Sequence, residues 1–553
     1  MSYLDSAASG GELVEANQFF APVQYGPMNA LLDEYARLRI QIEQVAALFE
    51  GGVQQVVEYF IEGNRSGDGS RYSSLSAEKI FQLPGAVAAL NTAYWRRALD
   101  LTDFYSIMPQ KRRDEWNEQF HKHQTPDFTR ENVIATIEAL DAARMTFLAE
   151  RVDGIFRALS GEHVTNSPAA FGKRMIIGYL INSYGTTNHD RVGYINDLRA
   201  VIAKFMGRDE PTSWNATSHV VEAARKEKRG QWVTLDGGAL QLRAYKCGTA
   251  HLEVHPDMAW RLNCILHTLY PNAIPASFRE KPKRKPKEHA AILRPLPFAV
   301  VNALQSLEPA YRLTKNTGED SWKRQFIRTN IPNAVQMRYS SIAQGSGRDP
   351  VSVEVDRVLS YLGAVNTEGG VYQFDYDPSS VLSEVICSGC LPDQKTHQYY
   401  PTPETVARAA VDMADIGDEH SCLEPSAGTG GLADYMPKDR TTCVELSELH
   451  CTVLRAKGYR TDCADFIQWS KNGRRFDRVV MNPPFADGRA LAHVEAASGL
   501  VSDGGRLVAI LPASMRGKPV LSGWTAEWSG VFANEFSGTG VSVAIVAFVR
   551  EAA

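Results

Sequence analysis

The sequence predicts a multidomain protein that ends in an α/β domain with a mostly parallel, doubly wound sheet. A mainly helical region and α+β segments precede this domain. With 553 residues, the chain is too long for a single hydrophobic core. Its early part shows apolar residues at helical spacing, and from residue 397 short apolar strands alternate with helices. Such alternation is typical of parallel sheets that bind ligands at the carboxyl ends of their strands.

Composition limits the class of protein. The contents of 44% apolar and 22% charged residues are those of an ordinary soluble globular protein. We expect no membrane span and no secretory signal, because neither a long apolar run nor a basic-then-apolar start is present. The eight scattered cysteines favour a reducing, cytoplasmic compartment. A net charge of −5 argues against a uniformly basic nucleic-acid binder but leaves room for local basic surface.

Residues 1–160 are predicted to be mainly helical. A helix over 28–49 carries one apolar seam, formed by Leu31, Tyr35, Leu38, Ile42, Val45 and Phe49. The seam is short for a coiled coil, so packing within the chain is favoured and the oligomeric state, monomer or homodimer, stays open. A second helix is predicted over 131–159, with Val133, Ile137, Leu140, Leu148, Val152, Ile155 and Leu159 on one side.

Residues 161–289 are predicted to form an α+β domain. Apolar and polar residues alternate on both sides of Asp236-Gly237-Gly238, which predicts a hairpin, and a helix over 257–271 follows. The segment "REKPKRKPKEH" (279–289) is basic and holds two prolines, which predicts a linker at a domain boundary. A phosphate-contacting strap and a merely solvated loop are equally compatible with it.

Residues 290–390 are predicted to be α+β, winged-helix-like and in contact with DNA. A helix ending at Leu362 is followed by a short hairpin at Gly369-Gly370, which is how a winged helix ends. Many α+β proteins that touch no DNA share this pattern. Upstream, "SWKRQFIR" (321–328) interleaves cations with aromatic rings, which suits a nucleic-acid surface or an amphipathic helix equally. The residues are Trp322, Lys323, Arg324, Phe326 and Arg328.

One cysteine pair has the spacing of a metal site. Cys387 and Cys390 form a CxxC motif, and His397 lies nearby. A structural zinc site needs four ligands, and no second pair of matching spacing follows. A plain loop is therefore favoured, and no metal is predicted.

From residue 397 the pattern predicts a ligand site. A Pro-rich turn leads into a helix, with Thr402 as its N-cap and Pro403 as its first residue. A strand then runs into a glycine-rich turn, where Gly428 and Gly430 permit close backbone approach. The helix expected after this turn offers free N–H groups.

The next strands each end in a polar side chain. Glu445 stands at a strand end where an acid can accept both hydroxyls of a ribose. Asp465, with Phe466 beside it, suits an adenine amino group and its ring. Another apolar strand runs directly into Asn482-Pro483-Pro484-Phe485. One acid alone would be interpreted as a helix cap or a solvated loop, but three such ends in register point to one ligand.

These motifs resemble a known family. "LEPSAGTGG", "VELS", "CADF" and "NPPF", in this order after "YYPTP", are similar to class I S-adenosylmethionine-dependent methyltransferases that act on exocyclic amines of DNA bases. The motif order resembles the gamma arrangement of N6-adenine enzymes. The resemblance covers about residues 395–550 and implies a Rossmann-like methyltransferase domain over 391–553, with S-adenosylmethionine as cofactor.

The resemblance also implies residue roles. Cofactor binding falls to Tyr400, Thr402, Pro403, Glu424, Pro425, Ala427, Gly428, Gly430, Glu445, Asp465 and Phe466. The amine site falls to Asn482, Pro483, Pro484 and Phe485. The chemistry agrees, because the lone pair of an adenine N6 is delocalised into the ring. Two acceptors, the Asn482 amide oxygen and the Pro483 carbonyl, can hold both amino hydrogens and favour a tetrahedral nitrogen, while Phe485 stacks on a flipped base.

The target molecule is less sharply defined by the motif. Asn-Pro-Pro-aromatic also occurs in enzymes that methylate cytosine N4 of DNA, guanine N2 of ribosomal RNA or the amide of glutamine. The "YYPTP" segment favours adenine in double-stranded DNA, as does a resemblance upstream. There, 151–175 and 248–275 are similar to a domain of unknown function fused to such methyltransferases on phages, prophages and plasmids. An inactive DNA-binding protein is disfavoured because Asn482 and the cofactor acids are intact.

One departure from the family concerns DNA recognition. Gamma-type enzymes usually carry a target-recognition domain after the last strand, and we expect none here. We therefore expect residues upstream of 390 to hold the duplex and to set any sequence preference.

Overall fold

The computed structural model describes residues 25–49, 56, 81–102, 104–159, 166–167, 169–172, 174–182, 186–209, 214–226, 230–282, 293–315, 326–337, 349–367, 370–392, 399–536 and 539–550. The chain divides into two compact units. The first comprises Met1–Trp232 with Ala239–Ala290, and the second comprises Val233–Gly238 with Ala291–Ala553. The finer boundaries at residues 160 and 390 stay predictions. In the described part of the chain, no helix is both long and apolar enough to cross a membrane.

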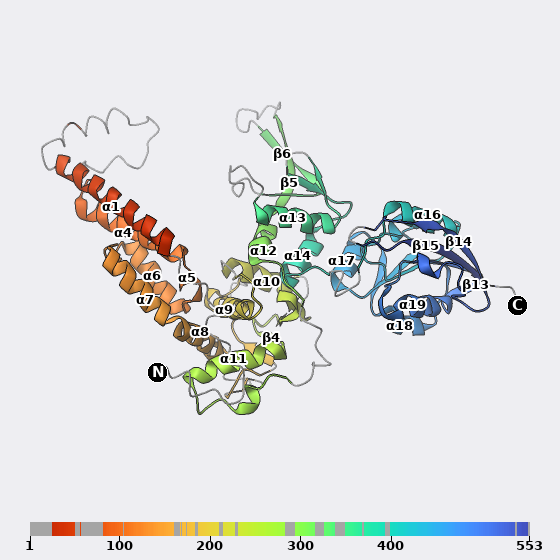
Figure 1. Cartoon of the computed structure of the whole chain (residues 1–553), viewed down its shortest axis with the longest axis horizontal. Helices are drawn as coiled ribbons and strands as arrows, with labels where there is room; N and C mark the ends of the chain where they lie inside the picture. The colour runs from red at the N-terminus through yellow and green to blue at the C-terminus, as the bar shows by residue number, and fades with distance from the viewer. Residues whose placement is uncertain are drawn as a thin grey trace. The chain divides into compact units, whose positions relative to one another are not determined.

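The first unit begins with helices, as expected (Figure 1). They are α1 (Tyr25–Leu48), α4 (Leu83–Asp100), α5 (Phe104–Ile107), α6 (Gln110–Lys122), α7 (Arg130–Ala142) and α8 (Arg144–Ala158). The helix predicted over 131–159 is wrong as one continuous element, because the chain breaks at Ala143. The apolar stripe is interrupted there by Arg144, whose guanidinium lies 4.5 Å from the centre of the Phe104 ring.

The first unit continues with β1 (Arg174–Ile177), α9 (His189–Phe205), α10 (Trp214–Lys226), β3 (Leu240–Ala244), β4 (Ala250–Val254), α11 (Pro256–Leu269) and η4 (Ala276–Phe278). Together with β2 (Val233–Leu235), the strands form a sheet in the order β1-β4-β3-β2. The predicted turn is η3 (Asp236–Gly238), in which Gly237 has a φ of 70°. The predicted helix after it is confirmed as α11. Most of the basic segment, from Lys283 onward, lies outside the described residues.

The middle of the chain contains α12 (Phe298–Gln305), β5 (Glu308–Lys315), β6 (Phe326–Gln336), α13 (Pro350–Tyr361), β7 (Val365–Thr367), β8 (Val371–Gln373) and α14 (Ser379–Ser388). The predicted helix and hairpin are confirmed as α13 and β7–β8. Their antiparallel sheet has the order β5-β6-β8-β7, and its longer hairpin was not predicted.

Two interpretations in this region are wrong. Phe326 begins strand β6 rather than an amphipathic helix, because it pairs with Lys315 across the hairpin. Residues Trp322, Lys323 and Arg324 of the same segment lie outside the described residues. Cys387 lies in helix α14 and not in a loop, since that helix ends only at Gly389, which has the left-handed φ of 64°. His397 lies outside the described residues, among which no cluster of metal-ligating side chains occurs.

The last part of the chain is the predicted α/β domain. Its elements are α16 (Glu404–Ala414), β9 (Cys422–Pro425), η6 (Ala433–Tyr435), β10 (Thr441–Glu445), α17 (Glu448–Ala456), β11 (Arg460–Cys463), α18 (Phe466–Trp469), η7 (Ser470–Asn472), β12 (Phe476–Met481), η8 (Ala486–Gly488), α19 (Arg489–Ser498), β13 (Val501–Pro512), η9 (Ala513–Met515), β14 (Trp524–Phe532) and β15 (Val543–Arg550).

The seven strands form one sheet in the order β11-β10-β9-β12-β13-β15-β14. Neighbours from β11 to β13 are parallel, and β15 is antiparallel to both β13 and β14. The expected mostly parallel sheet is therefore confirmed. Helix α16 lies on one side of the sheet and α18 with α19 on the other (Figure 1). This double cover explains why β9 and β10 are buried along their whole length.

The order of the sheet reverses between β9 and β12. From β9 the chain moves outward through β10 and β11, and from β12 it moves the other way to β13. In open α/β sheets, ligands bind outside the carboxyl ends of the strands at such a point. The segments that follow β9, β10 and β12 therefore meet at the place where a ligand is expected.

Helix α17 belongs to two hydrophobic cores. Its Val453 and Leu449 pack with Val355 and Leu359 of α13 in the core of the middle region. Its Leu454, by contrast, packs with residues that lie under the glycine-rich loop of the sheet domain. The helix that follows Glu445 is thus fixed from both sides.

Candidate active site at the carboxyl edge of the parallel sheet

A cavity of about 780 Å³ lies at the carboxyl ends of β9, β10 and β12. This volume falls in the range of pockets that enclose a small organic ligand. Twelve predicted site residues line it: Tyr400, Thr402, Glu424, Ala427, Gly428, Glu445, Asp465, Phe466, Asn482, Pro483, Pro484 and Phe485. Three others do not. Pro403 precedes α16, Pro425 ends β9, and Gly430 approaches Leu454 instead.

The corner after β12 is held by a side chain from another segment. The strand ends at Met481, and the amide nitrogen of the next residue, Asn482, donates to the Thr402 hydroxyl at 3.1 Å. In this orientation the Asn482 amide oxygen is left to accept from a ligand. The prediction of Thr402 as the N-cap of α16 is wrong, because its hydroxyl is used here and Pro403 occupies the cap position.

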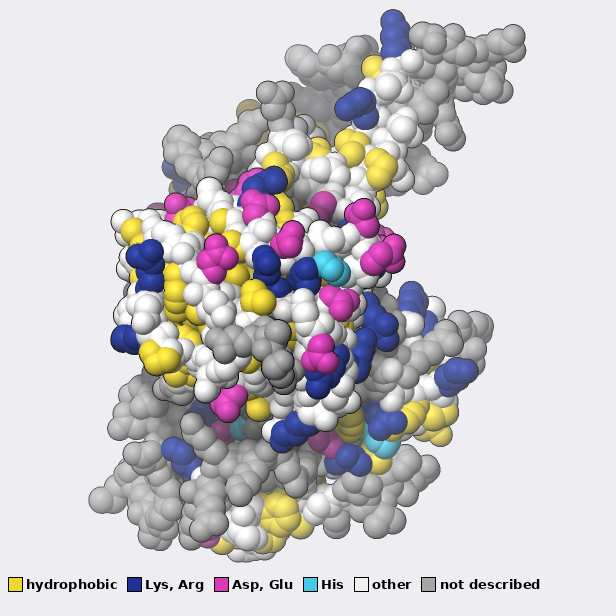
Figure 2. Space-filling model, turned by 90° about the vertical axis from the view of Figure 1, so that its right-hand side faces the viewer, with side chains coloured by type: hydrophobic (Ala, Val, Ile, Leu, Met, Phe, Trp, Pro, Cys, Tyr) yellow, Lys and Arg dark blue, Asp and Glu magenta, His cyan; other side chains and the backbone are white. Residues whose placement is uncertain are grey.

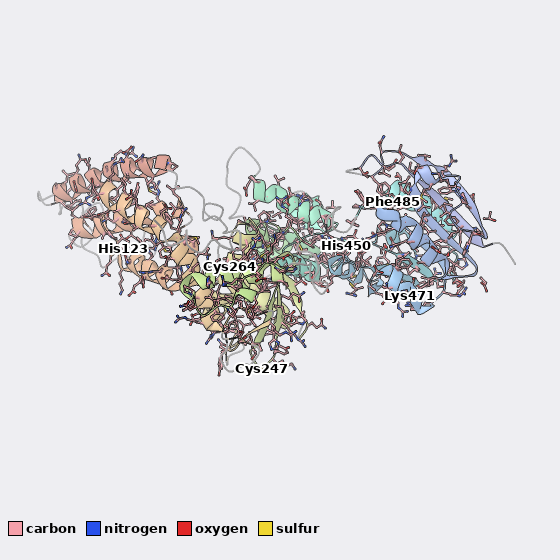
Figure 3. All side chains as sticks on the ribbon, turned by 60° about the horizontal axis from the view of Figure 1, so that its bottom comes forward. His123, Cys247, Cys264, His450, Lys471 and Phe485 are labelled. Atoms are coloured by element: carbon pink, nitrogen blue, oxygen red, sulfur yellow. The ribbon has the colours of Figure 1, made fainter. Side chains whose placement is uncertain are left out.

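Phe485 adds an aromatic surface to the same corner. Its ring is half-buried and packs against the hydrophobic clusters on both sides of the sheet. Both Phe485 and His450 lie in the sheet domain, where Figure 3 labels them. Phe485 is therefore anchored by the core on one side while it lines the cavity on the other.

The loop after β9 adopts the close turn that its glycines predict. Ser426, Gly428 and Gly430 all have positive φ values, of 59°, 57° and 92°. A Cβ atom at Gly428 would lie 2.5 Å from the ring of Tyr399, so only glycine fits there. The Tyr399 hydroxyl lies 2.7 Å from that of Thr429, and burial raises the pKa of Tyr399 to about 12.

The helix predicted after this loop is wrong, since only the short η6 forms there. The chain leaves the helical conformation at Met436, because this residue precedes Pro437 and is driven into an extended conformation. The Glu424 carboxylate accepts the N–H of Ala433 at 2.7 Å. Burial raises the pKa of Glu424 well above its usual range, and neighbouring Asp434 and Glu445 add to this effect. Glu424 therefore holds its proton to higher pH than an exposed glutamate does.

Glu445 is a buried acid with both oxygens engaged by the backbone. One oxygen accepts the Gly428 N–H and the other accepts the Ser447 N–H, each at 2.8 Å. Burial works to raise its pKa, but His450 and these two N–H groups bring the pKa below its usual value. Because each carboxylate oxygen has a second lone pair, Glu445 can still accept a hydroxyl of a ligand.

His450 and Tyr361 form a support behind Glu445 that the sequence did not reveal. The Tyr361 hydroxyl donates to the Pro392 carbonyl at 2.8 Å and lies 2.7 Å from His450 Nε2. Since its one proton goes to the carbonyl, this hydroxyl accepts from Nε2–H. His450 Nδ1 then lies 3.7 Å from Glu445. Tyr361 and His450 are 89 residues apart, so no spacing pattern could have paired them.

Asp465 is a helix N-cap, and its role toward an adenine stays a prediction. One of its oxygens caps α18 by accepting the Gln468 N–H at 3.0 Å, while the exposed residue also lines the cavity. Phe466 is buried beside it, and its ring centre lies 5.4 Å from that of His493. His493 was missed, although it lines the cavity and lies 3.2 Å from the Ser426 hydroxyl. Burial lowers the pKa of His493, which favours its neutral form.

Acidic side chains outnumber basic ones along the described lining. The acids are Asp375, Glu424, Asp434, Glu445 and Asp465, and the bases are Lys457 and Arg489. Lys457 is itself bound to Asp434 at 2.6 Å. Such a cavity attracts a cationic ligand with hydroxyl groups and disfavours a phosphate.

Comparisons with known proteins agree with parts of this description. A family model described as a domain of unknown function (DUF4942) matches residues 87–272, which include 151–175 and most of 248–275. The match agrees with the resemblance to a domain of unknown function seen upstream, whereas the association of that domain with DNA methyltransferases and with phages stays a prediction. No curated protein matches the chain.

Solved structures resemble a quarter to a third of the chain. TrmN from Thermus thermophilus is 18% identical over 27% of this chain and 48% of its own, with a TM-score of 0.23. Precorrin-6y C5,15-methyltransferase from Geobacter metallireducens is 15% identical over 27% and 88%, with a TM-score of 0.22. TehB from Haemophilus influenzae is 13% identical over 29% and 65%, with a TM-score of 0.23. This chain spans about half of TrmN, and likeness at this level assigns no function.

Proposed function

We propose that this protein is an S-adenosylmethionine-dependent DNA methyltransferase that modifies the N6 amine of an adenine flipped out of the duplex. One observation carries the proposal. A single cavity is lined both by the Asn482 corner, suited to a planar amine, and by an acidic loop region, suited to a cationic nucleoside. Both features lie where the sheet order reverses, which is the ligand-binding position of this kind of fold.

The residues present fit this cofactor better than they fit a phosphate-bearing nucleotide. S-adenosylmethionine, when bound, supplies a methyl group on a positively charged sulfur, and it carries no phosphate. Glu445 can accept ribose hydroxyls, and Asp465 with Phe466 can accept an adenine amine and cover its ring. The close turn at Gly428 leaves no space for a side chain beside Tyr399, as expected of a loop that follows a ligand closely.

At the amine end, catalysis would depend on position. The Asn482 amide oxygen and the Pro483 carbonyl accept the two hydrogens of the target amine, which directs its lone pair away from its own ring. The donation from Asn482 to Thr402 fixes which end of the amide is offered. Alignment of this kind can contribute about 7–11 kcal/mol to lowering a barrier. Phe485 offers a surface on which the base stacks after it leaves the duplex.

Methyl transfer to DNA tests the proposal. The full-length protein is incubated with the cofactor and duplex DNA, and the DNA is then digested to nucleosides for mass spectrometry. We expect N6-methyldeoxyadenosine, and none with the Asn482→Ala variant. Parallel reactions with structured RNA and a glutamine-containing peptide cover the other planar amines. Modified cytosine, RNA or peptide without modified adenine would contradict the proposed substrate. The absence of any methylated product with all of these substrates would contradict the proposed reaction.

Context and location are further predictions. Long-read sequencing of DNA from cells that express the protein reports the methylated base together with its neighbours, and so reveals any recognition sequence. A cytoplasmic location, an origin on a mobile element and the state of a monomer or homodimer remain predictions of the sequence.

A further inference from the structure

The outer half of the β5–β6 hairpin leaves its sheet. Residues Tyr311–Lys315 pair with Phe326–Asn330 alone, and the pairing register shifts between Pro309 and Tyr311. Only Ala334–Gln336, at the inner end of β6, pair with β8. The outer part, which we call the arm (311–315 and 326–330), is therefore a two-stranded ribbon that projects from its sheet (Figure 1). An isolated two-stranded ribbon is only marginally stable in water, so its exposed faces call for an explanation.

One face of the arm combines cations with apolar groups. Residues directly opposite each other share a face, so it carries Tyr311, Leu313, Lys315, Phe326, Arg328 and Asn330. Leu313 is 54% exposed and Phe326 is 55% exposed. The Arg328 guanidinium lies 4.5 Å from the centre of the Tyr311 ring, which holds it in place. Arg312 and Thr329 lie on the other face.

Charge sets the arm apart from its surroundings. The arm carries Arg312, Lys315 and Arg328 and no acidic residue. Residues 391–553, by contrast, carry 20 acidic and 16 basic side chains, for a formal charge of −4. Acidic and basic side chains alternate over the face of the sheet domain seen in Figure 2. A polyanion therefore finds no general attraction at the domain that holds the cavity.

The helix that the sequence suggested for DNA contact is a weaker candidate. Helix α13 exposes Arg357, but Glu354 binds its guanidinium with both carboxylate oxygens. The Asp356 carboxylate accepts from the Tyr372 hydroxyl. The exposed face of α13 thus offers little free positive charge, whereas none of the three cations of the arm has an acid within its own ribbon.

We propose that the arm is a DNA-binding ribbon that enters the major groove of the duplex. The major groove admits a two-stranded ribbon, and its floor presents thymine methyl groups that suit Leu313 and Phe326. Arg312 and Lys315 reach phosphates on the two sides of the groove, and this contact is independent of base sequence. This proposal identifies the surface that holds the substrate DNA, so it rests on the proposed function.

Binding of a labelled duplex to the full-length protein, without cofactor, tests the arm. Fluorescence anisotropy is measured over a range of salt concentrations with the double variant Arg312→Gln/Lys315→Gln. We expect Kd to rise roughly ten-fold or more near 0.1 M salt, and the slope of log K against log salt to become less steep by about 2. Arg357→Gln, in the same domain but outside the arm, is the matched control and leaves both values unchanged. Phe326→Ser is expected to weaken binding without changing the slope, whereas Val353→Ser, on α13, changes neither.

The outcomes separate this proposal from the proposed function. Equal duplex affinity for the arm variants and the wild type overturns the proposed role of the arm, even if adenine is methylated. Tighter binding of a structured RNA through the same residues also overturns it, as does a wild type that binds no duplex. Duplex binding that depends on the arm, without any methyl transfer, supports the proposed role of the arm and contradicts the proposed reaction. Thermal unfolding, which does not depend on the proposed cofactor, shows that each variant is folded.

Discussion

The two ends of the cavity are built in different ways. The amine end is four consecutive residues after β12, with one hydroxyl from Thr402 to orient the amide. The cofactor end depends on Glu445, which backbone groups, His450 and Tyr361 support from three separate segments. A local corner is stiff because prolines restrict it, whereas a network is stiff only while every member is present. Substitutions at the amine end should therefore act on transfer alone, and substitutions at the cofactor end on binding.

The largest expected effect is at Asn482. Asn482→Ala removes an acceptor that is aligned only with the reacting amine, so we expect kcat to fall by at least about 10²–10³-fold. The Kd of the cofactor should stay near normal, because the substitution leaves the cofactor acids in place and removes only a donor to the Thr402 hydroxyl. Single-turnover transfer and calorimetric titration on the same preparation measure the two quantities. A parallel loss of both would break the division between the two ends.

This division also explains what the sequence could predict. Strand β12 and its corner could be predicted because their residues are contiguous in the sequence. The parallel strands could be predicted because each is a short apolar run. Strand β14 was missed since it lies at the edge of the sheet and is mostly exposed, so it shows no clean alternation. The helix expected after the glycine loop is only the short η6, because Pro437 follows closely and its predecessor Met436 is extended.

The parts that depend on distant contacts were not predictable from the sequence. Tyr399 lies next to the predicted Tyr400, but only the close approach to Gly428 shows that its ring belongs to the cavity. The bond between Tyr361 and His450 joins residues that no periodic pattern relates. The long β5–β6 hairpin escaped notice because its outer half is exposed on both faces, which removes the alternation that marks a half-buried strand.

The second expected effect is at Glu445. Glu445→Gln keeps the size of the side chain but replaces one acceptor oxygen with a donor that faces the Ser447 N–H. Hydrogen bonds to a charged group are worth about 1.5–3 kcal/mol, so we expect cofactor Kd to rise roughly 10- to 150-fold. Asp434→Asn is the matched control, because Asp434 lines the same cavity but is already bound to Lys457. A fall in kcat at saturating cofactor, with the cofactor Kd unchanged, would contradict the assignment of Glu445 to the cofactor end.

The third effect is a dependence of cofactor binding on pH. Because burial raises the pKa of Glu424, the empty protein holds this proton above the pH at which an exposed glutamate ionises. A positive ligand favours the charged carboxylate, so binding should release a proton. The affinity should then rise by up to about ten-fold per pH unit until the raised pKa is passed. Titration calorimetry in buffers of different ionisation enthalpy counts the released protons.

Glu424→Gln is the control for this effect, since the amide cannot titrate and its oxygen can still accept the Ala433 N–H. The pH dependence should disappear in this variant. The raised pKa also means that Glu424 stabilises the empty fold at low pH, and that this stabilisation is lost as the pH rises through the raised pKa. Thermal unfolding of the variant should therefore be less sensitive to a rise in pH than that of the wild type. An unchanged pH profile of cofactor affinity would exclude Glu424 as its source.

The smallest effect is the one that tests the network most directly. Tyr361→Phe removes the hydroxyl that accepts from His450 Nε2–H, so His450 is no longer held in its orientation toward Glu445. A neutral hydrogen bond contributes about 0.5–1.5 kcal/mol, which predicts a two- to twelve-fold rise in cofactor Kd with kcat unchanged at saturation. Tyr376→Phe is the matched control, because Tyr376 lies in the same hydrophobic cluster and its hydroxyl bonds only to the Leu362 carbonyl.

Both tyrosine variants should lose similar stability in thermal unfolding, but only Tyr361→Phe should weaken cofactor binding. Combining Tyr361→Phe with His450→Gln should cost less than the sum of the two single effects, because both variants break the same chain of contacts. Additive effects would mean that Tyr361 acts on the cavity by another route. Since Tyr361 ends α13, and α17 shares a core with that helix, the expected coupling means that the middle region helps to shape the cofactor end. The Asn482 corner, by contrast, is built from residues of the sheet domain, including Thr402.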